Sequence, residues 1–257
     1  MTELRSKTSV ITQSEDSQLD ARNTLWDLFH SPVMSDSEKE RNPGLFLRSA
    51  NLARILALAE IYQEIVQIPG SIADFGTWRG QNFILCENFR AIFEPFNKQR
   101  RVYAFDTFEG YRSGEGESQV GHQDFKDGTY STGAEYDSVL ARIMSIHESI
   151  NVLHNVSSGH QVVKGDILKT LPEVMEAQKN LCFSLAFFDM NLEGPTSFAV
   201  ETILPRMVPG SRLVFFQMQR DFLPGEGATY INHILHKRPH TIRRSTIYPS
   251  VTVIEIS

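Results

Sequence analysis

"IADFGTWRGQN", residues 72–82, continues an apolar strand pattern into a turn that holds an acid and two glycines. Asp74, Gly76 and Gly80 form the pattern acid-x-Gly-x-x-x-Gly. Gly76 can adopt backbone angles that other residues avoid, and it lets a ligand approach the main chain. Gly80 allows the next helix to start close to the strand, with free N–H groups that suit a carboxylate or phosphate. The stretch therefore predicts a strand, a ligand-binding turn and a helix.

Asp74 is the residue that distinguishes this turn from an ordinary one. An acid in an otherwise apolar strand costs free energy unless it meets a cation or hydrogen-bond donors. The ammonium group of a ligand would meet that need. The alternative is a plain glycine-rich turn in which Asp74 caps the helix, and the stretch alone does not decide between the two.

Composition limits the classes of function. The 257 residues are 41% hydrophobic and 22% charged, which suits one sizeable α/β domain with an extension. The net charge of −6 does not favour binding to nucleic acid. Cys86 and Cys182 lie among apolar neighbours without disulfide or zinc spacing. Because no apolar run reaches membrane-spanning length and the N-terminus has no signal-peptide pattern, we expect a soluble cytoplasmic protein.

Apolar runs of strand length alternate with helical patterns from residue 71 onward. Repeated strand–helix units imply a parallel sheet with right-handed crossovers. Runs such as "SLAFF" and "RLVFF" lack polar alternation, as strands buried on both faces should. The closing runs "TIRRSTIY" and "SVTVIEIS" predict an antiparallel hairpin. We expect strands at 71–75, 101–105, 161–165, 182–188 and 211–217, and helices at about 78–94, 134–149, 172–179, 195–206 and 226–237.

The N-terminal part is expected to be helical and separate from the sheet. A short helix is predicted over 19–30, and a long one starts near Pro43 and ends before Pro69. The polar stretch between them contains two prolines and is predicted to be a connection. We therefore place an N-terminal extension at 1–42 and the main domain at 43–257.

Acids follow the other strands of the predicted sheet, at the ends where such folds bind ligands. Asp106, with Thr107 beside it, follows the second strand, where an acid can accept hydrogen bonds from both hydroxyls of a ribose. Asp166 follows the third strand and can reach an adenine edge. Asp189 follows the fourth. The alternatives are a loop aspartate at Asp106 and a helix N-cap at Asp166.

These strand ends narrow the choice of ligand. A dinucleotide site prefers Gly-x-Gly-x-x-Gly, and a P-loop requires Gly-Lys-Ser/Thr, but "GTWRGQ" has neither. An acid on the first strand suits a nucleoside that carries an ammonium and a carboxylate group. S-adenosylmethionine has both groups and is the predicted cofactor.

Four segments, in this order, resemble the class I S-adenosylmethionine-dependent methyltransferases of the macrocin O-methyltransferase-like family. They are "DFGTWRGQN", "AFDTFEGY", "GDILKTLP" and "FFDMNLEGPTSFAVETILPRMVPGS", and "LPGEGA" at 223–228 is a fifth. The resemblance covers roughly residues 43–240. It implies an α/β fold with a Rossmann-like, seven-stranded, mostly parallel sheet, a C-terminal antiparallel hairpin and three α/β/α layers. It also implies methyl transfer to a hydroxyl of a small polar, sugar-like or natural-product substrate.

The resemblance assigns roles to individual residues. Asp106 corresponds to the ribose-binding acid, Asp166 to the residue beside the adenine, and Asp189 to an acid that binds a divalent metal and is a candidate general base. His122, in a long polar insertion, is a second candidate base because histidine titrates near neutrality. Its alternative is a surface loop histidine. The cofactor loop consists of Asp74, Gly76, Thr77, Trp78, Arg79 and Gly80, and the substrate-binding candidates are Tyr130, Gln217, Gln219 and Glu226.

The chain departs from the family pattern where a metal would bind. Relatives carry an adjacent acidic pair after the fifth strand, but Phe216 and Gln217 stand there, and Asn191 replaces a second acid after the fourth strand. Magnesium prefers several charged oxygens. Asp221 and Glu226 lie nearby in the sequence and are alternative acids. We expect a pocket without a complete metal site and assign no metal ligand.

Three functions remain open at this stage. The first is O-methylation, and the second is N-methylation of an amine, which would not need the metal. The third is a cofactor-binding protein with impaired catalysis, although the intact cofactor loop argues against loss of the ligand. The resemblance also implies a homo-oligomer in which the N-terminal helices are candidates for pairing. The acceptor has no readable signature in 19–68 or 111–133.

Overall fold

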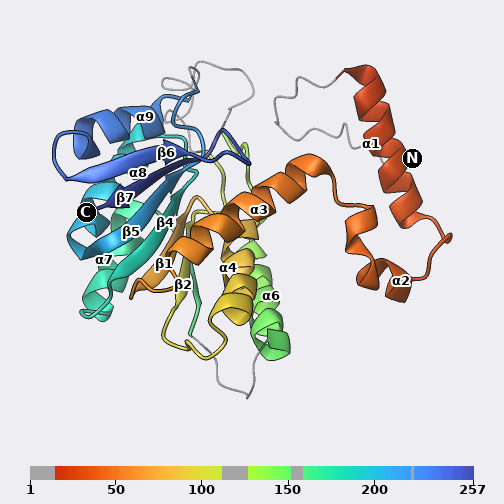
Figure 1. The fold of residues 1–257 in the computed structure, drawn as a ribbon, viewed down its shortest axis with the longest axis horizontal. Helices are drawn as coiled ribbons and strands as arrows, with labels where there is room; N and C mark the ends of the chain where they lie inside the picture. Colours follow the sequence, from red (N-terminus) through yellow and green to blue (C-terminus); the bar gives the residue numbers. More distant parts are fainter. Residues whose placement is uncertain (1–14, 112–126, 152–158, 221–222) are drawn as a thin grey trace. The chain divides into compact units, whose positions relative to one another are not determined.

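The structure is a computed structural model, and it describes residues 15–111, 127–151, 159–220 and 223–257. The chain divides into two compact units, Met1–Arg54 and Ile55–Ser257. The described helices are α1 (Asp16–His30), α2 (Asp36–Arg41), α3 (Ser49–Glu64), α4 (Gln81–Phe93), α6 (Tyr136–Asn151), α7 (Ile167–Ala177), α8 (Glu193–Ile203) and α9 (Gly225–Thr229), and the strands are β1 (Ser71–Phe75), β2 (Val102–Asp106), β3 (Gln161–Lys164), β4 (Phe183–Phe188), β5 (Met207–Phe215), β6 (His240–Arg244) and β7 (Thr252–Ile256) (Figure 1).

The central feature is a seven-stranded sheet with the order β3-β2-β1-β4-β5-β7-β6. Strands β1 to β5 pair in parallel, and β7 runs antiparallel to both β5 and β6. This confirms the predicted sheet and its terminal hairpin. The strand order reverses between β1 and β4, and folds of this kind bind ligands at the carboxyl ends of the strands at such a point.

Helices cover both faces of the sheet, and each face has its own apolar core (Figure 1). Side chains alternate along β1, so that Ala73 and Phe75 belong to the core under α7 and α8, while Ile72 belongs to the core under α3, α4 and α6. The rings of Phe75 and Phe188 stack at 5.2 Å, and those of Phe188 and Phe215 stack at 4.8 Å. The predicted three-layer arrangement is therefore confirmed.

Several element boundaries differ from those expected. Helix α7 begins at Ile167 rather than 172, because Asp166 caps it and Pro172 lies inside it. The stretch expected to be a connection contains α2, whose Ser35 and Glu38 form a capping box. Cys182 is partly exposed, unlike the buried Cys86.

Residues 15–54, the described part of the Met1–Arg54 unit, contain aromatic contacts but no buried residue. No residue of α1 or α2 is buried, and the rings of Phe29 and Phe46 lie 5.1 Å apart. The unit boundary at Arg54 falls within α3, and the predicted domain boundary after residue 42 stays a prediction. Among the described residues, no helix has the length and apolarity needed to cross a membrane.

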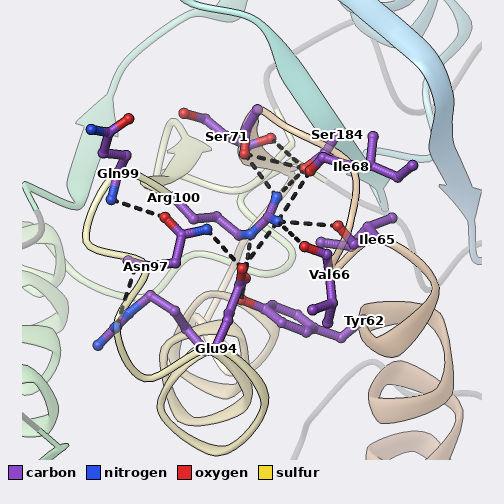
Figure 2. A network of polar contacts seen from close by, with 12 residues as sticks. Tyr62, Ile65, Val66, Ile68, Ser71, Glu94, Asn97, Gln99, Arg100 and Ser184 are labelled. Atoms are coloured by element: carbon purple, nitrogen blue, oxygen red, sulfur yellow. Dashed lines mark hydrogen bonds and ion pairs between the residues drawn. The ribbon is translucent and has the colours of Figure 1, made fainter.

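Arg100 anchors the amino-terminal edge of the sheet (Figure 2). It is 2% exposed and forms an ion pair with Glu94, and it donates to Ser184 Oγ at 2.6 Å and to the carbonyl of Gly70 at 2.8 Å. It also donates to three carbonyls in the turn that follows α3, those of residues 65, 66 and 68. This guanidinium therefore ties the turn after α3 to the amino ends of β1 and β4.

Candidate functional site

The carboxylate of Asp74 lies at the end of β1 and is fully buried. It accepts hydrogen bonds from the hydroxyl of Thr77 and from Asn82 Nδ2, the latter at 3.0 Å. Donors within the protein therefore hold Asp74 and tie the turn to the first turn of α4. Asn82 was not among the predicted site residues. The signal that could have found it is a buried amide at the start of an otherwise apolar helix.

The two glycines of the turn permit close packing. Gly76 has φ 78°, and a Cβ atom there would lie 2.7 Å from the carbonyl oxygen of Asp189. Gly80 also has φ 78°, and its Cβ would lie 2.3 Å from Leu140 in α6. The absence of a side chain at Gly80 therefore lets Leu140 of α6 pack closely against this turn. Gly76 brings the ends of β1 and β4 together, which places Asp189 beside the predicted cofactor loop.

Asp106 joins the ends of β1 and β2. The N–H groups of Trp78 and Phe108 donate to its two carboxylate oxygens, each at 2.7 Å. Burial raises the pKa of Asp106 above its usual value, although the bonds from Phe108 and Trp78 oppose that shift. A carboxylate offers about four acceptor positions. Asp106 therefore keeps capacity to accept further hydrogen bonds at the edge of the sheet.

Aromatic rings lie beside this junction. The ring of Tyr130 is 5.6 Å from that of Trp78 and 5.8 Å from that of Tyr111, both edge to face. Trp78 is 39% exposed, so part of the indole is accessible. The guanidinium of Arg79 lies 4.7 Å from the ring centre of Tyr136. The rings of Trp78, Tyr130 and Tyr111 form a connected aromatic group, and the N–H of Trp78 donates to Asp106, so a flat part of a ligand can pack beside this carboxylate.

Two of the predicted cofactor residues make local backbone contacts. Asp166 caps α7 by accepting a hydrogen bond from the N–H of Leu168 at 3.0 Å, which is the helix N-cap role given above as its alternative. Thr107 Oγ1 accepts from the N–H of Glu109 at 3.3 Å. The cofactor contacts of Thr107 and Asp166 stay predictions.

The end of β4 carries Asp189 and Asn191. The N–H of Asp189 donates to the carbonyl of Phe75 at 3.0 Å, which fixes the backbone against β1. Asn191 has φ 64° and is 9% exposed, and its Nδ2 donates to the hydroxyl of Tyr111 at 2.8 Å. Burial raises the pKa of Tyr111, so its hydroxyl keeps its proton at neutral pH. Tyr111 was not predicted as a site residue.

Glu226, on α9, lies near the end of β4. It is fully buried, and its Oε2 accepts from the N–H of Gln217 at 2.6 Å. Burial, and next the charge of Asp189, raise the pKa of Glu226 well above its usual value. Phe216 instead packs into the core, with its ring 6.2 Å from that of Phe187. Gln219 is exposed.

The arrangement of acids and glycines at the strand ends agrees with one family. The model of the macrocin O-methyltransferase family (TylF) matches residues 42–219. The chain belongs to the macrocin O-methyltransferase family. It is therefore an S-adenosylmethionine-dependent methyltransferase.

Solved structures share the fold of this macrocin O-methyltransferase family member. CalS11, described as a calicheamicin methyltransferase, is 24% identical with a TM-score of 0.87, and the match covers 97% of this chain and 96% of that one. An apo structure of CalS11, described as a TDP-rhamnose 3′-O-methyltransferase, is 23% identical with a TM-score of 0.81 over 95% and 96% of the two chains. The O-methyltransferase NovP is 14% identical with a TM-score of 0.56 over 80% and 79%. No curated protein matches.

The side chains present do not fit the metal site expected from the family resemblance. Within the described ranges, no group of three or more His, Cys, Asp or Glu side chains could hold a metal ion. Phe216 occupies the core, and Gln217 and Asn191 offer amides where the resemblance implies acids. His122 and Asp221 lie outside the described residues.

Proposed function

We propose that this methyltransferase acts on a hydroxyl of a small polar, sugar-like or natural-product acceptor, without a complete divalent-metal site. The observation that carries the proposal is the junction at Asp106. Its carboxylate is held by the N–H groups of Trp78 and Phe108 at the ends of β1 and β2, and it retains acceptor capacity for a ribose.

The cofactor would extend across the ends of the first three strands. Asp106 and Thr107 would bind the ribose, and Asp166 would lie beside the adenine. Asp189 would lie near the methionine part, because Gly76 brings its backbone to the cofactor loop. Asp74 would position the loop through Thr77 and Asn82. The loop itself is Asp74, Gly76, Thr77, Trp78, Arg79 and Gly80.

Methyl transfer is an in-line displacement. The acceptor oxygen forms a bond to the methyl carbon as the carbon–sulfur bond breaks, and the hydroxyl proton passes to a base. The products are a methyl ether and S-adenosylhomocysteine. We assign the base to Asp189, whose backbone is fixed by Phe75, with His122 as the second candidate. A positioned base contributes about 10²–10⁴ in rate. The acceptor-binding candidates are Tyr130, Gln217, Gln219 and Glu226.

N-methylation of an amine is the second candidate function. It is favoured by the burial of Phe216 in the core, which removes an acid from the place where the family resemblance implies a metal ligand. An amine acceptor is more nucleophilic than a hydroxyl and has less need of a metal. A protein that binds the cofactor without turnover is the third.

Calorimetry and activity assays separate these functions. We expect S-adenosylmethionine and S-adenosylhomocysteine to bind, and methyl transfer to hydroxyl acceptors to continue in excess chelator. Loss of activity in chelator with recovery on adding magnesium would contradict the metal-free site. Absence of S-adenosylhomocysteine binding would contradict the whole proposal.

The organisation of the chain is also proposed. Residues 43–257 would form the methyltransferase domain, with 1–42 as an extension. The partner would be a small molecule rather than a nucleic acid, and the chain would assemble into a homo-oligomer. Analytical ultracentrifugation of the full chain and of a form lacking 1–42 tests the assembly: one monomeric species for the full chain would contradict it.

A further inference from the structure

Three buried oxygen atoms at the carboxyl ends of the strands have no hydrogen-bond partner among the described residues. They are Oδ1 of Asn191, Oε1 of Gln217 and Oε1 of Glu226. Asn191 is 9% exposed and Glu226 is not exposed at all. A buried acceptor without a donor costs about 1–3 kcal/mol. Three such atoms from three segments of the chain therefore call for an occupant that supplies donors.

The three side chains belong to one cluster. The N–H of Gln217 donates to Glu226 at 2.6 Å. A Cβ atom on Gly225, the residue before Glu226, would lie 2.4 Å from the carbonyl oxygen of Asn191. The charge of Asp189 acts on Glu226, and the charges of both acids act on Tyr111, which is hydrogen-bonded to Asn191. The cluster thus adjoins the proposed base.

The chemistry of the cluster selects among occupants. A hydroxyl brings one donor but also two acceptor lone pairs, and it carries no charge. A magnesium ion prefers near-octahedral oxygen ligands with charge, and no group of three or more acidic, histidine or cysteine side chains in the described part of the chain could hold a metal ion. An ammonium group brings three donors, no acceptor and a positive charge. It supplies one donor for each of the three oxygens.

The charges of the acids in this cluster favour a ligand that carries a positive charge. Two carboxyl groups, those of Asp189 and Glu226, interact unfavourably, and burial adds to the penalty on ionised Glu226. The charge of Arg220 and the N–H groups of Gln217 and Phe216 oppose this penalty. A bound ammonium group would offset the charge of both acids.

We infer that Asn191, Gln217 and Glu226 bind an ammonium group carried by the methyl acceptor, so that the acceptor belongs to the amine-bearing hydroxyl compounds, such as amino sugars. The inference rests on the proposed function, because it places this ammonium group beside the hydroxyl that Asp189 deprotonates. It names the substrate class that the proposed function leaves open.

The test uses the full-length protein saturated with S-adenosylhomocysteine. Methylammonium and tetramethylammonium chloride are titrated at equal ionic strength, because the two ions share a charge but only methylammonium has N–H donors. We expect methylammonium to bind with a dissociation constant lower by about tenfold or more, as three charge-assisted hydrogen bonds require. Equal binding of the two ions, or binding of neither, would overturn the inference.

Matched variants locate the effect. Glu226→Gln keeps the side-chain size but removes the charge, and it should abolish the preference for methylammonium. Glu193→Gln removes a charge from a neighbouring residue and should leave the preference unchanged. Glu193 is close to the cluster, because a Cβ atom on Gly225 would lie 2.6 Å from its backbone nitrogen. Asn191→Asp introduces a residue that, like asparagine, tolerates the observed positive φ. The added negative charge should strengthen methylammonium binding. A preference that survives Glu226→Gln would refute the assignment.

Two further readouts keep the alternatives apart. Binding of S-adenosylhomocysteine is measured in every sample, and its absence would count against the proposed function rather than against this subsite alone. Magnesium chloride is titrated in parallel. If magnesium binds to the wild type and Glu226→Gln abolishes that binding, the cluster is a metal site and the ammonium assignment is wrong.

Discussion

Buried polar side chains occur at both ends of the parallel strands, but their surroundings differ. At the amino ends, the three guanidinium nitrogens of Arg100 all donate to acceptors of the protein (Figure 2). At the carboxyl ends, Asn191, Gln217 and Glu226 each keep a buried oxygen without a donor among the described residues. Burial of a polar group therefore does not by itself mark a functional site. Single buried atoms without a partner also occur elsewhere in the described residues, as at Lys98 Nζ and Ser211 Oγ, so the more informative property is that three such oxygens occur in one cluster.

The carboxyl ends contain the same contrast on a smaller scale. Asp74 and Asp106 accept hydrogen bonds from the turn and from α4, so the proposed cofactor end is already ordered by the protein. The Glu226 cluster also contains hydrogen bonds, but three of its buried oxygens have no donor among the described residues. The difference indicates that the proposed cofactor half is preorganised, whereas the proposed acceptor half is completed by its ligand.

Removing Arg100 should have the largest effect on stability. Arg100→Met leaves Glu94 buried without its cation, which costs about 3–5 kcal/mol of unfolding free energy. Arg101→Met is the matched control, because Arg101 is exposed and donates to Gln178 at 3.2 Å, and it should change stability by less than about 0.5 kcal/mol. Urea unfolding measures both. Equal stabilities for the two variants would show that the amino-terminal network is not structural.

Removing Asp106 should act on the cofactor. Asp106→Ala loses two hydrogen bonds from a ribose to a charged acceptor, so the dissociation constant for S-adenosylhomocysteine should rise about a hundredfold or more. Asp137→Ala removes an acid on α6 that pairs with Lys164 on β3, and it should leave the affinity unchanged. Calorimetry measures both constants, and an unchanged value for Asp106→Ala would remove the end of β2 from the cofactor site.

Adding a methyl group at Gly76 should disturb the close contact between the ends of β1 and β4. Gly76→Ala combines a left-handed backbone with a contact of 2.7 Å to the carbonyl of Asp189, so we expect a loss of about 2 kcal/mol and weaker cofactor binding. Gly194→Ala meets nothing within 4 Å and should be neutral or slightly stabilising. Thermal unfolding with and without S-adenosylhomocysteine compares the pair. A fully stable Gly76→Ala would show that β1 and β4 do not approach this closely.

The pH dependence of cofactor binding should report on Asp106. Burial raises its pKa above the usual value of about 3.9 for aspartate. Only the ionised form accepts from both ribose hydroxyls, so affinity should be full above the raised pKa and should fall by up to about tenfold per pH unit below it. Asp106→Asn should lose this pH dependence. A wild-type affinity that stays constant down to pH 4 would contradict the shift.

Much of the fold could be predicted from the sequence because it depends on local patterns. Unbroken apolar runs such as "SLAFF" require a strand buried on both faces, and Asp106 and Asp189 directly after their runs mark the carboxyl ends of the second and fourth strands. Boundaries were less certain where one residue has two roles. Pro172 marks the predicted start of a helix but lies within α7, and Pro209 and Gly210 lie inside β5, which begins earlier than predicted.

The candidate site was predictable only in part. The cofactor loop is a continuous motif, so its residues could be named together. The cluster around Glu226 is assembled from the loop after β2, the ends of β4 and β5, and α9, and no local spacing connects Tyr111 with Asn191. The partners of Asp74 and Asp166 were likewise not predictable individually, because each depends on the geometry of the following helix.

A crystal structure of the full chain with S-adenosylhomocysteine tests the central claim most directly. The account predicts density across the ends of β1 and β2, with both ribose hydroxyls within hydrogen-bond distance of the Asp106 carboxylate. Density at another place on the sheet, or an Asp106 that does not contact the ribose, would contradict it.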